Sequence, residues 1–193
     1  AILSRNCAWW VMADLAIWMA GHVTVPIYPS LKAQTIHRIL EHCSAKACFL
    51  GAADEHEAGE AGSPPGVTCV RFPTAAPNDW PTWDVLVTAN RPLSGNPTRP
   101  GDELSTIIYT SGTTGAPKGA VLRHKNLLAA TESLRMAWRW SPDDRLVHCL
   151  PVFHAHGLCV GVYGTLLAGA SAVLLPGFDP ATGTREQCDV CLW

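Results

Sequence analysis

Hydrophobic and polar positions follow first a helical and then a strand period at the start of the chain. Cys7–Gly21 is apolar over most of a helix circumference, interrupted by Asp14, and is too short to cross a bilayer, so it predicts a buried core helix. His22–Pro29 predicts a short strand closed by prolines, and Ser30 is expected to cap a second helix. Lys46–Gly51 predicts the next strand. This alternation predicts an α/β fold with parallel strand pairing.

The pattern weakens between Ala52 and Pro100. Eight of the fifteen prolines lie in 64–100, and the only apolar patch there is the short stretch Trp83–Val87. Prolines at this density interrupt helices and strands, so this part predicts partly irregular connecting structure.

Regular patterning returns at Leu104. Ser105–Thr110 predicts a strand and Ala120–Leu122 a second, brief strand. Asn126–Trp138 has apolar residues at helical spacing, and Arg145–Leu150 predicts another strand.

The uncharged stretch Gly157–Leu175 admits two interpretations. Its 19 residues are long enough for a membrane span, and two of its glycines have the small-xxx-small spacing. However, Gly169 is typical of a helix end, and Ala170–Leu175 is typical of a buried strand that follows it. We favour the helix and strand, and leave peripheral membrane association open.

Composition narrows the class of protein. The chain has 193 residues, 48% hydrophobic and 16% charged, with a net charge of −2, which suits a globular domain and argues against a nucleic-acid partner. Its eight cysteines are scattered, several within apolar runs, so we expect reduced thiols and a cytoplasmic protein. Cys188 and Cys191 form a lone CxxC without a second pair, which disfavours a structural zinc site.

The residues Tyr109–Gly119 read YTSGTTGAPKG. Glycines let a backbone approach an anion with its N–H groups, hydroxyls add neutral donors, and a lysine supplies charge, so the string predicts a phosphate-binding loop exposed between two strands. It differs from the Walker A loop, GxxxxGK[ST], because Pro117 precedes the lysine, Gly119 follows it, and no helix begins there. A surface turn with an incidental lysine is the alternative.

YTSGTTGAPKG resembles the phosphate-binding signature of the adenylate-forming superfamily: acyl-CoA synthetases, adenylation domains of peptide synthetases, and luciferases. Leu150–Leu158, LPVFHAHGL, resembles the LPxFHxxGL motif of the acyl-CoA synthetase branch. The stretch NCAWWVMADLAIWMAGHVTVPIYPSL is similar to bacterial fatty acyl-CoA synthetases. The resemblance covers most of residues 1–180.

This resemblance implies a fold and a domain organisation. The fold is the layered α/β architecture of the N-terminal domain of adenylate-forming enzymes, incomplete here. Residues 1–193 would be a partial AMP-binding domain: a first α/β portion with its Pro-rich connector in 1–95, the phosphate loop and acyl pocket in 96–180, and an atypical tail in 181–193. The family's C-terminal domain is expected to be absent, so we expect a fragment.

The resemblance also assigns site residues. Those implied to surround the ATP phosphates are Thr110, Ser111, Gly112, Thr113, Thr114, Gly115 and Lys118. Thr110 would also be the protein hydroxyl on Mg²⁺, and Lys118 and His154 would be the catalytic residues. The residues implied to line the acyl pocket are Phe153, His154 and Gly157. His156 has no role in the motif and is expected to pack or to form a hydrogen bond.

The implied function is that of an acid–thiol ligase, an ATP-dependent acyl-CoA synthetase. It would activate a small-molecule carboxylic acid with ATP and Mg²⁺ to an acyl adenylate and pass the acyl group to coenzyme A. The adenylation domain of another adenylate-forming enzyme and a nucleotide-binding module without ligase activity are the alternatives. The Phe153-His154 pair favours the CoA ligase.

Some family properties have no counterpart in this sequence. The acidic metal ligand, the ribose-binding aspartate and the catalytic lysine of the family are not located in it, so we expect the 193-residue chain alone to be inactive. Its first third resembles long-chain enzymes, whereas residues 146–180 resemble malonyl- and short-chain enzymes. Acyl chain length and oligomeric state therefore stay open.

Overall fold

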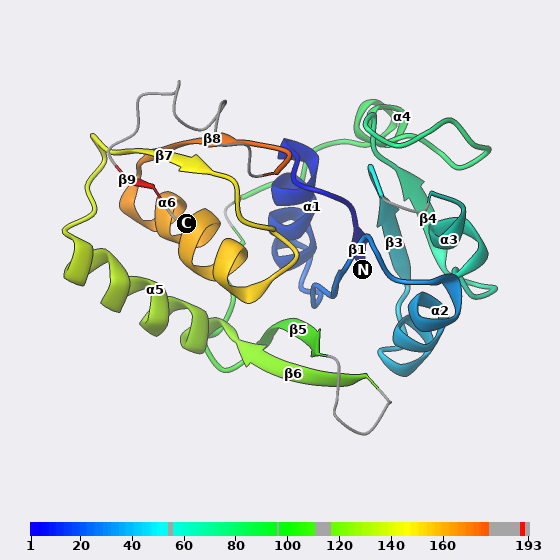
Figure 1. Ribbon diagram of the computed structural model, residues 1–193, viewed down its shortest axis with the longest axis horizontal. Helices are drawn as coiled ribbons and strands as arrows, with labels where there is room; N and C mark the ends of the chain where they lie inside the picture. The colour runs from blue at the N-terminus through cyan, green and yellow to red at the C-terminus, as the bar shows by residue number, and fades with distance from the viewer. Residues whose placement is uncertain (54–55, 96, 111–116, 178–189, 192–193) are drawn as a thin grey trace.

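The structure, a computed structural model, describes residues 1–53, 56–95, 97–110, 117–177 and 190–191. Its described strands form three sheets, with helices packed around them (Figure 1), which confirms the α/β fold class. The first sheet is parallel, with the order β2-β1-β3-β4. Its strands are β1 (Ile2–Leu3), β2 (Pro26–Ile27), β3 (Ala47–Leu50) and β4 (Thr68–Arg71).

Two helices accompany the first sheet. The predicted core helix forms as α1 (Ala8–Met19), with Trp10 fully buried. The second helix, α2 (Ala33–His42), begins after Lys32, so the prediction that Ser30 caps it is wrong. The reason is local: a turn in which Leu31 N–H donates to Tyr28 O (3.2 Å) comes first and uses the residues around Ser30.

The Pro-rich part of the chain is more regular than predicted. It contains α3 (His56–Ala61), β4 and α4 (Trp83–Ala89). Thr82 caps α4, its hydroxyl accepting from Val85 N–H at 3.4 Å. Strand β4 is short and lies close to prolines, and it pairs with β3 over four residues. Its stability therefore depends on a partner distant in sequence, which local patterning does not reveal.

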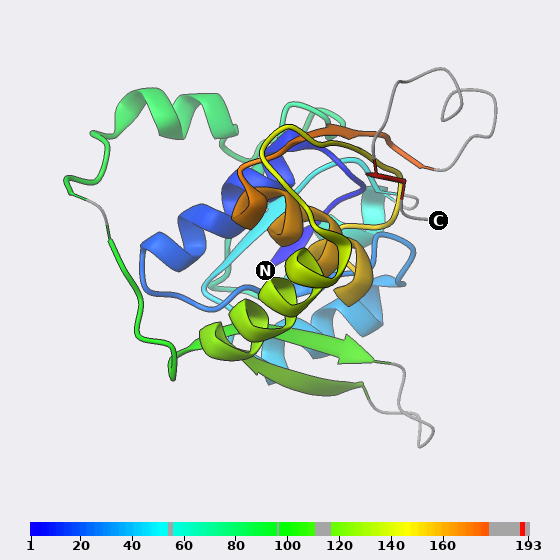
Figure 2. The same cartoon turned by 90° about the vertical axis from the view of Figure 1, so that its left-hand side faces the viewer.

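The second sheet is a hairpin of β5 (Leu104–Thr110) and β6 (Lys118–Arg123). It is antiparallel, whereas the parallel pairing predicted for the strands of residues 22–51 is confirmed in the first sheet. The hairpin meets the first sheet through Thr24, whose N–H donates to Ser105 O and whose carbonyl accepts from Ile107 N–H, both at 2.9 Å. The predicted helix follows as α5 (His124–Trp138), which lies between the hairpin and the helices of the third sheet (Figure 2).

The third sheet is parallel, with the order β8-β7-β9. Its strands are β7 (Arg145–His148), β8 (Ser171–Leu174) and β9 (Val190–Cys191). Between β7 and β8 the chain forms a π-helix, η1 (His156–Val162), and then α6 (Tyr163–Ala168), which ends at Gly169 with φ 71°. The favoured helix-and-strand interpretation of 157–175 is confirmed. In the described ranges, no helix combines the length and the apolar character that a membrane span requires.

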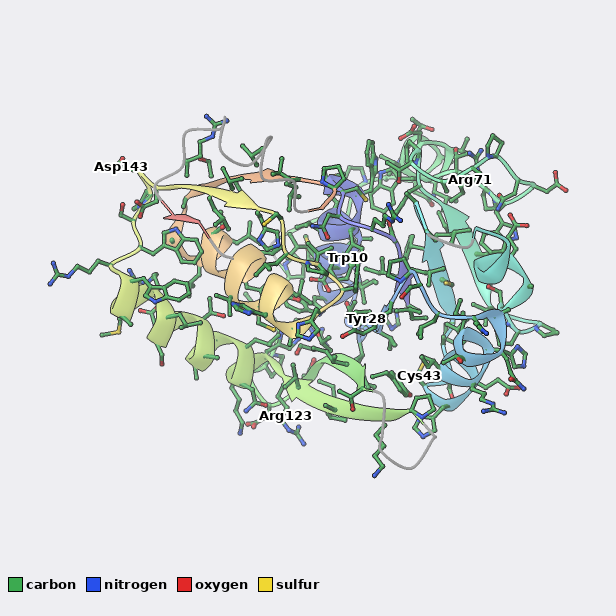
Figure 3. All side chains as sticks on the ribbon, viewed as in Figure 1. Trp10, Tyr28, Cys43, Arg71, Arg123 and Asp143 are labelled. Atoms are coloured by element: carbon green, nitrogen blue, oxygen red, sulfur yellow. The ribbon has the colours of Figure 1, made fainter. Side chains whose placement is uncertain are left out.

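Helix α1 lies between the first and third sheets (Figure 1), and its Trp10 lies near the middle of the molecule (Figure 3). The central hydrophobic cluster around it combines residues distant in sequence, namely Ile2, Phe72, Val152, Leu158 and Tyr163. Burying these side chains is the main term that holds the sheets together. The segments on either side of the predicted phosphate loop therefore rest on one shared core.

Candidate functional site

The predicted phosphate loop joins the ends of the hairpin. Strand β5 is buried at Ile108 and Tyr109 and reaches the surface at Thr110, which lies opposite Lys118 in the register. The Thr110 and Lys118 side chains are both exposed. The other predicted phosphate contacts, Ser111–Gly115, lie outside the described residues. The structure thus brings a hydroxyl and a lysine to the same end of one strand pair, where the loop begins and ends.

The base of this loop is held by Tyr109. Its hydroxyl is 2.6 Å from Nδ1 of His42 on α2, and the two rings meet edge to face at 5.7 Å. Gly119 makes room beside the ring, because a Cβ there would lie 2.7 Å from Cγ2 of Ile107 and 3.3 Å from Cζ of Tyr109. Burial raises the pKa of the Tyr109 hydroxyl, with a smaller contribution from Cys43, so the group stays protonated. Sequence reasoning missed this anchor, since His42 is distant in sequence and belongs to no motif.

The predicted acyl motif lies in the turn between β7 and η1. Phe153 is half-buried and His154 is exposed. Tyr28, which follows β2, contacts both: its ring is 5.1 Å from that of Phe153 and 6.3 Å from that of His154, in each case edge on. Tyr28 was not predicted, although an aromatic residue at a strand end beside a proline is a signal that could have found it. His156, expected to pack or to form a hydrogen bond, is exposed, and its backbone N–H donates to Nδ1 of His154 (3.3 Å).

Gly157 is buried beneath this turn. A Cβ at this position would lie 2.1 Å from the carbonyl oxygen of Pro151, a distance that no side chain tolerates. The turn can therefore pack against the first residues of η1 only because residue 157 is glycine. Its predicted contribution to an acyl pocket stays a prediction.

A cavity of about 460 Å³ opens beside the motif. Its lining includes Arg5, Asn6, Ser30, Cys149 and Phe153. Its walls combine one aromatic face with several hydrogen-bonding groups, which suits a small organic ligand. Phe153 lines the cavity, whereas the walls defined by the described residues do not include His154 or Gly157. Lys118 and His154 share no hydrogen bond or ring contact among the described residues.

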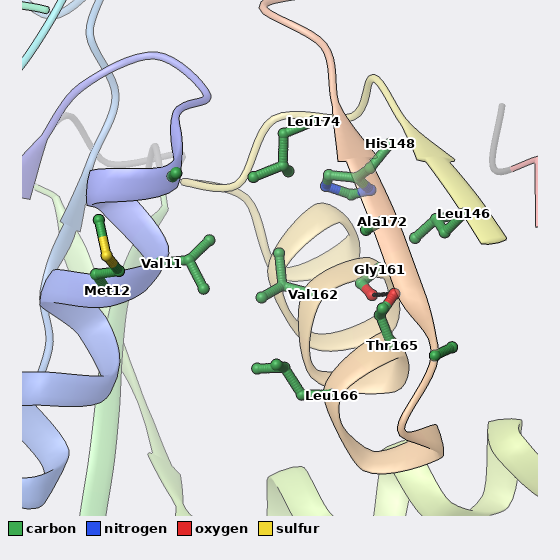
Figure 4. A pocket seen from close by; sticks show the side chains of 12 residues that line it. Val11, Met12, Leu146, His148, Gly161, Val162, Thr165, Leu166, Ala172 and Leu174 are labelled. Carbon is green, nitrogen blue, oxygen red and sulfur yellow. Dashed lines mark hydrogen bonds between the residues drawn. The ribbon is translucent and has the colours of Figure 1, made fainter. Parts of the chain in front are cut away.

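Two buried titratable groups lie behind the motif. Burial raises the pKa of Asp14 to about 7, although a hydrogen bond from the Tyr163 hydroxyl (2.9 Å) favours the ionised form. Burial, assisted by the charge of His156, lowers the pKa of His148 to about 4. The His148 ring lines an apolar cavity of about 280 Å³ between α1 and the third sheet (Figure 4), and in the described part of the molecule neither ring nitrogen has a hydrogen-bond partner. His148 is therefore neutral at physiological pH.

The described part of the chain provides no group of three or more His, Cys, Asp or Glu side chains able to hold a metal ion. The CxxC pair lies outside the side chains that the structure describes.

Comparison with known proteins gives the same identification as the two motifs. The profile of the family described as AMP-binding enzyme matches residues 1–191. Malonate–CoA ligase ACSF3, mitochondrial, of Homo sapiens is 33% identical over 184 residues, covering 93% of this chain and 30% of that protein. Malonate–CoA ligase of Arabidopsis thaliana is 30% identical over 191 residues, covering 92% of this chain and 29% of that protein. The chain thus spans under a third of the length of these relatives.

Solved structures agree in fold. ATP-bound MatB from Rhodopseudomonas palustris superposes with a TM-score of 0.76 at 29% identity, over 94% of this chain and 35% of that one. A malonyl-CoA ligase ternary product complex with methylmalonyl-CoA and AMP bound superposes with a TM-score of 0.72 at 27% identity, again over 94% and 35%. By its matched profile over residues 1–191, the chain belongs to the AMP-binding enzyme family, and the relatives reported above are CoA ligases.

Proposed function

We propose that this chain forms the phosphate-binding and acid-binding part of an ATP-dependent acid–CoA ligase. One observation carries the proposal: the YTSGTTGAPKG string joins two paired strands whose last and first residues, Thr110 and Lys118, face each other with exposed side chains. A hydroxyl and a lysine at the two ends of a glycine-rich loop suit the oxygens of a triphosphate. The names of the relatives and the ligands of the superposed structures support the same reaction.

On the phosphate side, the loop residues Thr110, Ser111, Gly112, Thr113, Thr114 and Gly115 would donate to the β- and γ-phosphates, with Lys118 supplying positive charge. Thr110 fits a place on Mg²⁺, because an exposed hydroxyl is an oxygen ligand and phosphate oxygens and water can complete the coordination. Bound Mg²⁺ would offset negative charge on the phosphates. Lys118 would stabilise the charge that grows on the departing pyrophosphate.

The reaction then has two steps. A carboxylate oxygen of the acid attacks the α-phosphorus of ATP, the bond to the β-phosphate oxygen breaks, and pyrophosphate leaves with the electron pair. The thiol of coenzyme A next attacks the acyl carbon as its proton is lost, and AMP leaves. The oxide of a carboxylate is a poor leaving group, and the first step replaces it by AMP, which is a good one. The protein mainly positions the reactants and stabilises charge.

On the acid side, Phe153 and His154 would form one wall of the acyl pocket, with Tyr28 supporting both rings. Gly157 would keep the turn close to η1. The names of the relatives make malonate the first acid to assay, with short- and long-chain fatty acids as the comparison set. No disulfide joins the six cysteines whose side chains the structure describes, which supports a compartment that keeps thiols reduced, such as the cytoplasm.

The test compares two exposed lysines in the ligase that carries this segment. Lys118→Ala should slow acid-dependent ATP–pyrophosphate exchange by about 10²–10³-fold, because one charge-assisted contact to the leaving group is lost. Lys125→Ala is the matched control, since Lys125 pairs with Asp102 on the surface, away from the loop, and should leave exchange unchanged. His154→Ala should alter the KM for the acid and not the KM for ATP. Equal exchange rates for Lys118→Ala and Lys125→Ala would refute the assignment of the loop.

A further inference from the structure

Asn6 lies between β1 and α1 and connects two distant parts of the chain. Its Nδ2 donates to the carbonyl of Leu150 at 2.8 Å and to that of Leu175 at 3.1 Å. Its Oδ1 accepts from the backbone N–H of Val152 at 2.9 Å. Both donor hydrogens and the acceptor of one half-buried side-chain amide are thus used on two segments more than 140 residues away in sequence.

The three bonds occur where the third sheet ends. Strands β7 and β8 pair up to His148 and Leu174, and Leu175 N–H then donates to His148 O at 2.9 Å. Beyond this point Pro151 has no N–H to donate, and the chain turns away toward η1. The Asn6 amide takes the place of the next backbone hydrogen bonds, because it satisfies one carbonyl from each of the two separating segments. Ligands of open parallel sheets bind at this carboxyl end of the strands.

The opposite side of the same turn is also restrained. His154 N–H donates to Pro151 O at 3.1 Å, and the buried Gly157 packs directly against that carbonyl. Val152 is fully buried between the two restraints, and Phe153 follows it. A shift of the Val152 backbone would therefore move Phe153 relative to the ring of Tyr28.

We propose that Asn6 is a positioning residue for the acid-binding pocket. It holds the turn 150–152 at the end of the sheet and thereby sets where Phe153 and His154 stand, without itself reacting. Asn6 lines the same 460 Å³ cavity as Phe153, so its hydrogen bonds restrain the wall of this cavity directly. The inference rests on the proposed function of Phe153 and His154. The hydrogen bonds of Asn6 are independent of that function.

The first test is made on the 193-residue chain by amide hydrogen exchange. Asn6→Ala should accelerate exchange at Val152 by about tenfold, the effect of one lost hydrogen bond, while exchange at Leu146 inside β7 stays unchanged. Asn6→Asp keeps the acceptor for Val152 but replaces the donors, so Val152 should stay protected in it. Asn90→Asp is the control, because Asn90 donates to Leu86 O on the exposed α4. Equal acceleration at Leu146 and Val152 would show general destabilisation and overturn the proposal.

The second test uses the ligase that carries this segment. Asn6→Ala should raise the KM for the acid by about tenfold or more, and Asn6→Asp, which keeps the hydrogen bond from Val152, should raise it less. Both variants should leave the KM for ATP within about twofold, because the phosphate loop is on the other strand pair. An active ligase whose KM for the acid is unchanged in both variants would overturn the positioning role while leaving the proposed function intact. An unmodified protein without ligase activity would instead count against the proposed function, and the exchange data on Val152 would still decide whether the restraint exists.

Discussion

Replacing Asp14 by asparagine should abolish a loss of stability between pH 5 and pH 8. The carboxyl group is fully buried, accepts from the Tyr163 hydroxyl through Oδ2, and in the described structure has no partner for Oδ1. Burial therefore raises its pKa from 3.8 to about 7. Between these two values the folded chain keeps a proton that the unfolded chain has released. The resulting stability is complete below about pH 4 and is lost as the pH rises through 7.

The size of the effect follows from the pKa difference. From pH 5 to about pH 7, roughly two pH units, the unfolded chain is ionised at this position while folded Asp14 keeps its proton, so the unfolding free energy falls by about 2–3 kcal/mol. Asparagine has the same shape and can still accept from Tyr163, so its variant lacks this cost. His148 acts with the opposite sign, because its lowered pKa removes stability as the pH falls below about 6.5. The contribution of His148 is the same in the unmodified chain and in Asp14→Asn, so it cancels in the difference between their unfolding free energies.

The assay is urea unfolding of the 193-residue chain at pH 5, 6, 7 and 8, followed by the fluorescence of its eight tryptophans. The unmodified chain should lose about 2–3 kcal/mol more than Asp14→Asn over this range. Asp143→Asn, at an exposed turn (Figure 3), is the matched control and should follow the unmodified chain. Parallel pH profiles for the unmodified chain and Asp14→Asn would refute the reasoning, since they would show that Asp14 is ionised in both states.

Two further substitutions test the packing around the motifs. Gly157→Ala should destabilise the chain by about 1–3 kcal/mol in the same unfolding assay, because the added Cβ would overlap the Pro151 carbonyl. Gly177→Ala is the control and should have little effect, because the space around Gly177 is open. Equal stabilities of the two variants would contradict this prediction. Tyr109→Phe should cost about 1 kcal/mol through the lost hydrogen bond to His42, seen as a lower Tm, and an unchanged Tm would show that water replaces the bond at no cost.

Much of the local structure could be predicted because periodicity and motif spacing are local properties. The apolar stretch after Cys7 forms α1, the pattern after Asn126 lies within α5, and Gly169 ends α6 as expected. The two motifs were sufficient to identify the family, because both strings resemble its signatures and the family's profile matches residues 1–191. The roles of Thr110 and Lys118 on the phosphates were assigned from the motif alone and stay predictions.

The remaining features depend on contacts between residues distant in sequence. A strand pattern does not state the direction of its partner, so the antiparallel β5–β6 pair and the existence of β4 were decided by tertiary pairing. The placement of Asn6 on Leu150 and Leu175 likewise required the fold, since an isolated asparagine between a strand and a helix is an ordinary turn residue. The pKa of Asp14 is a property of its burial, which no sequence window contains. Sequence by itself determined which groups are available for the chemistry, and tertiary structure decided their partners, because hydrogen bonds and desolvation depend on distance in space.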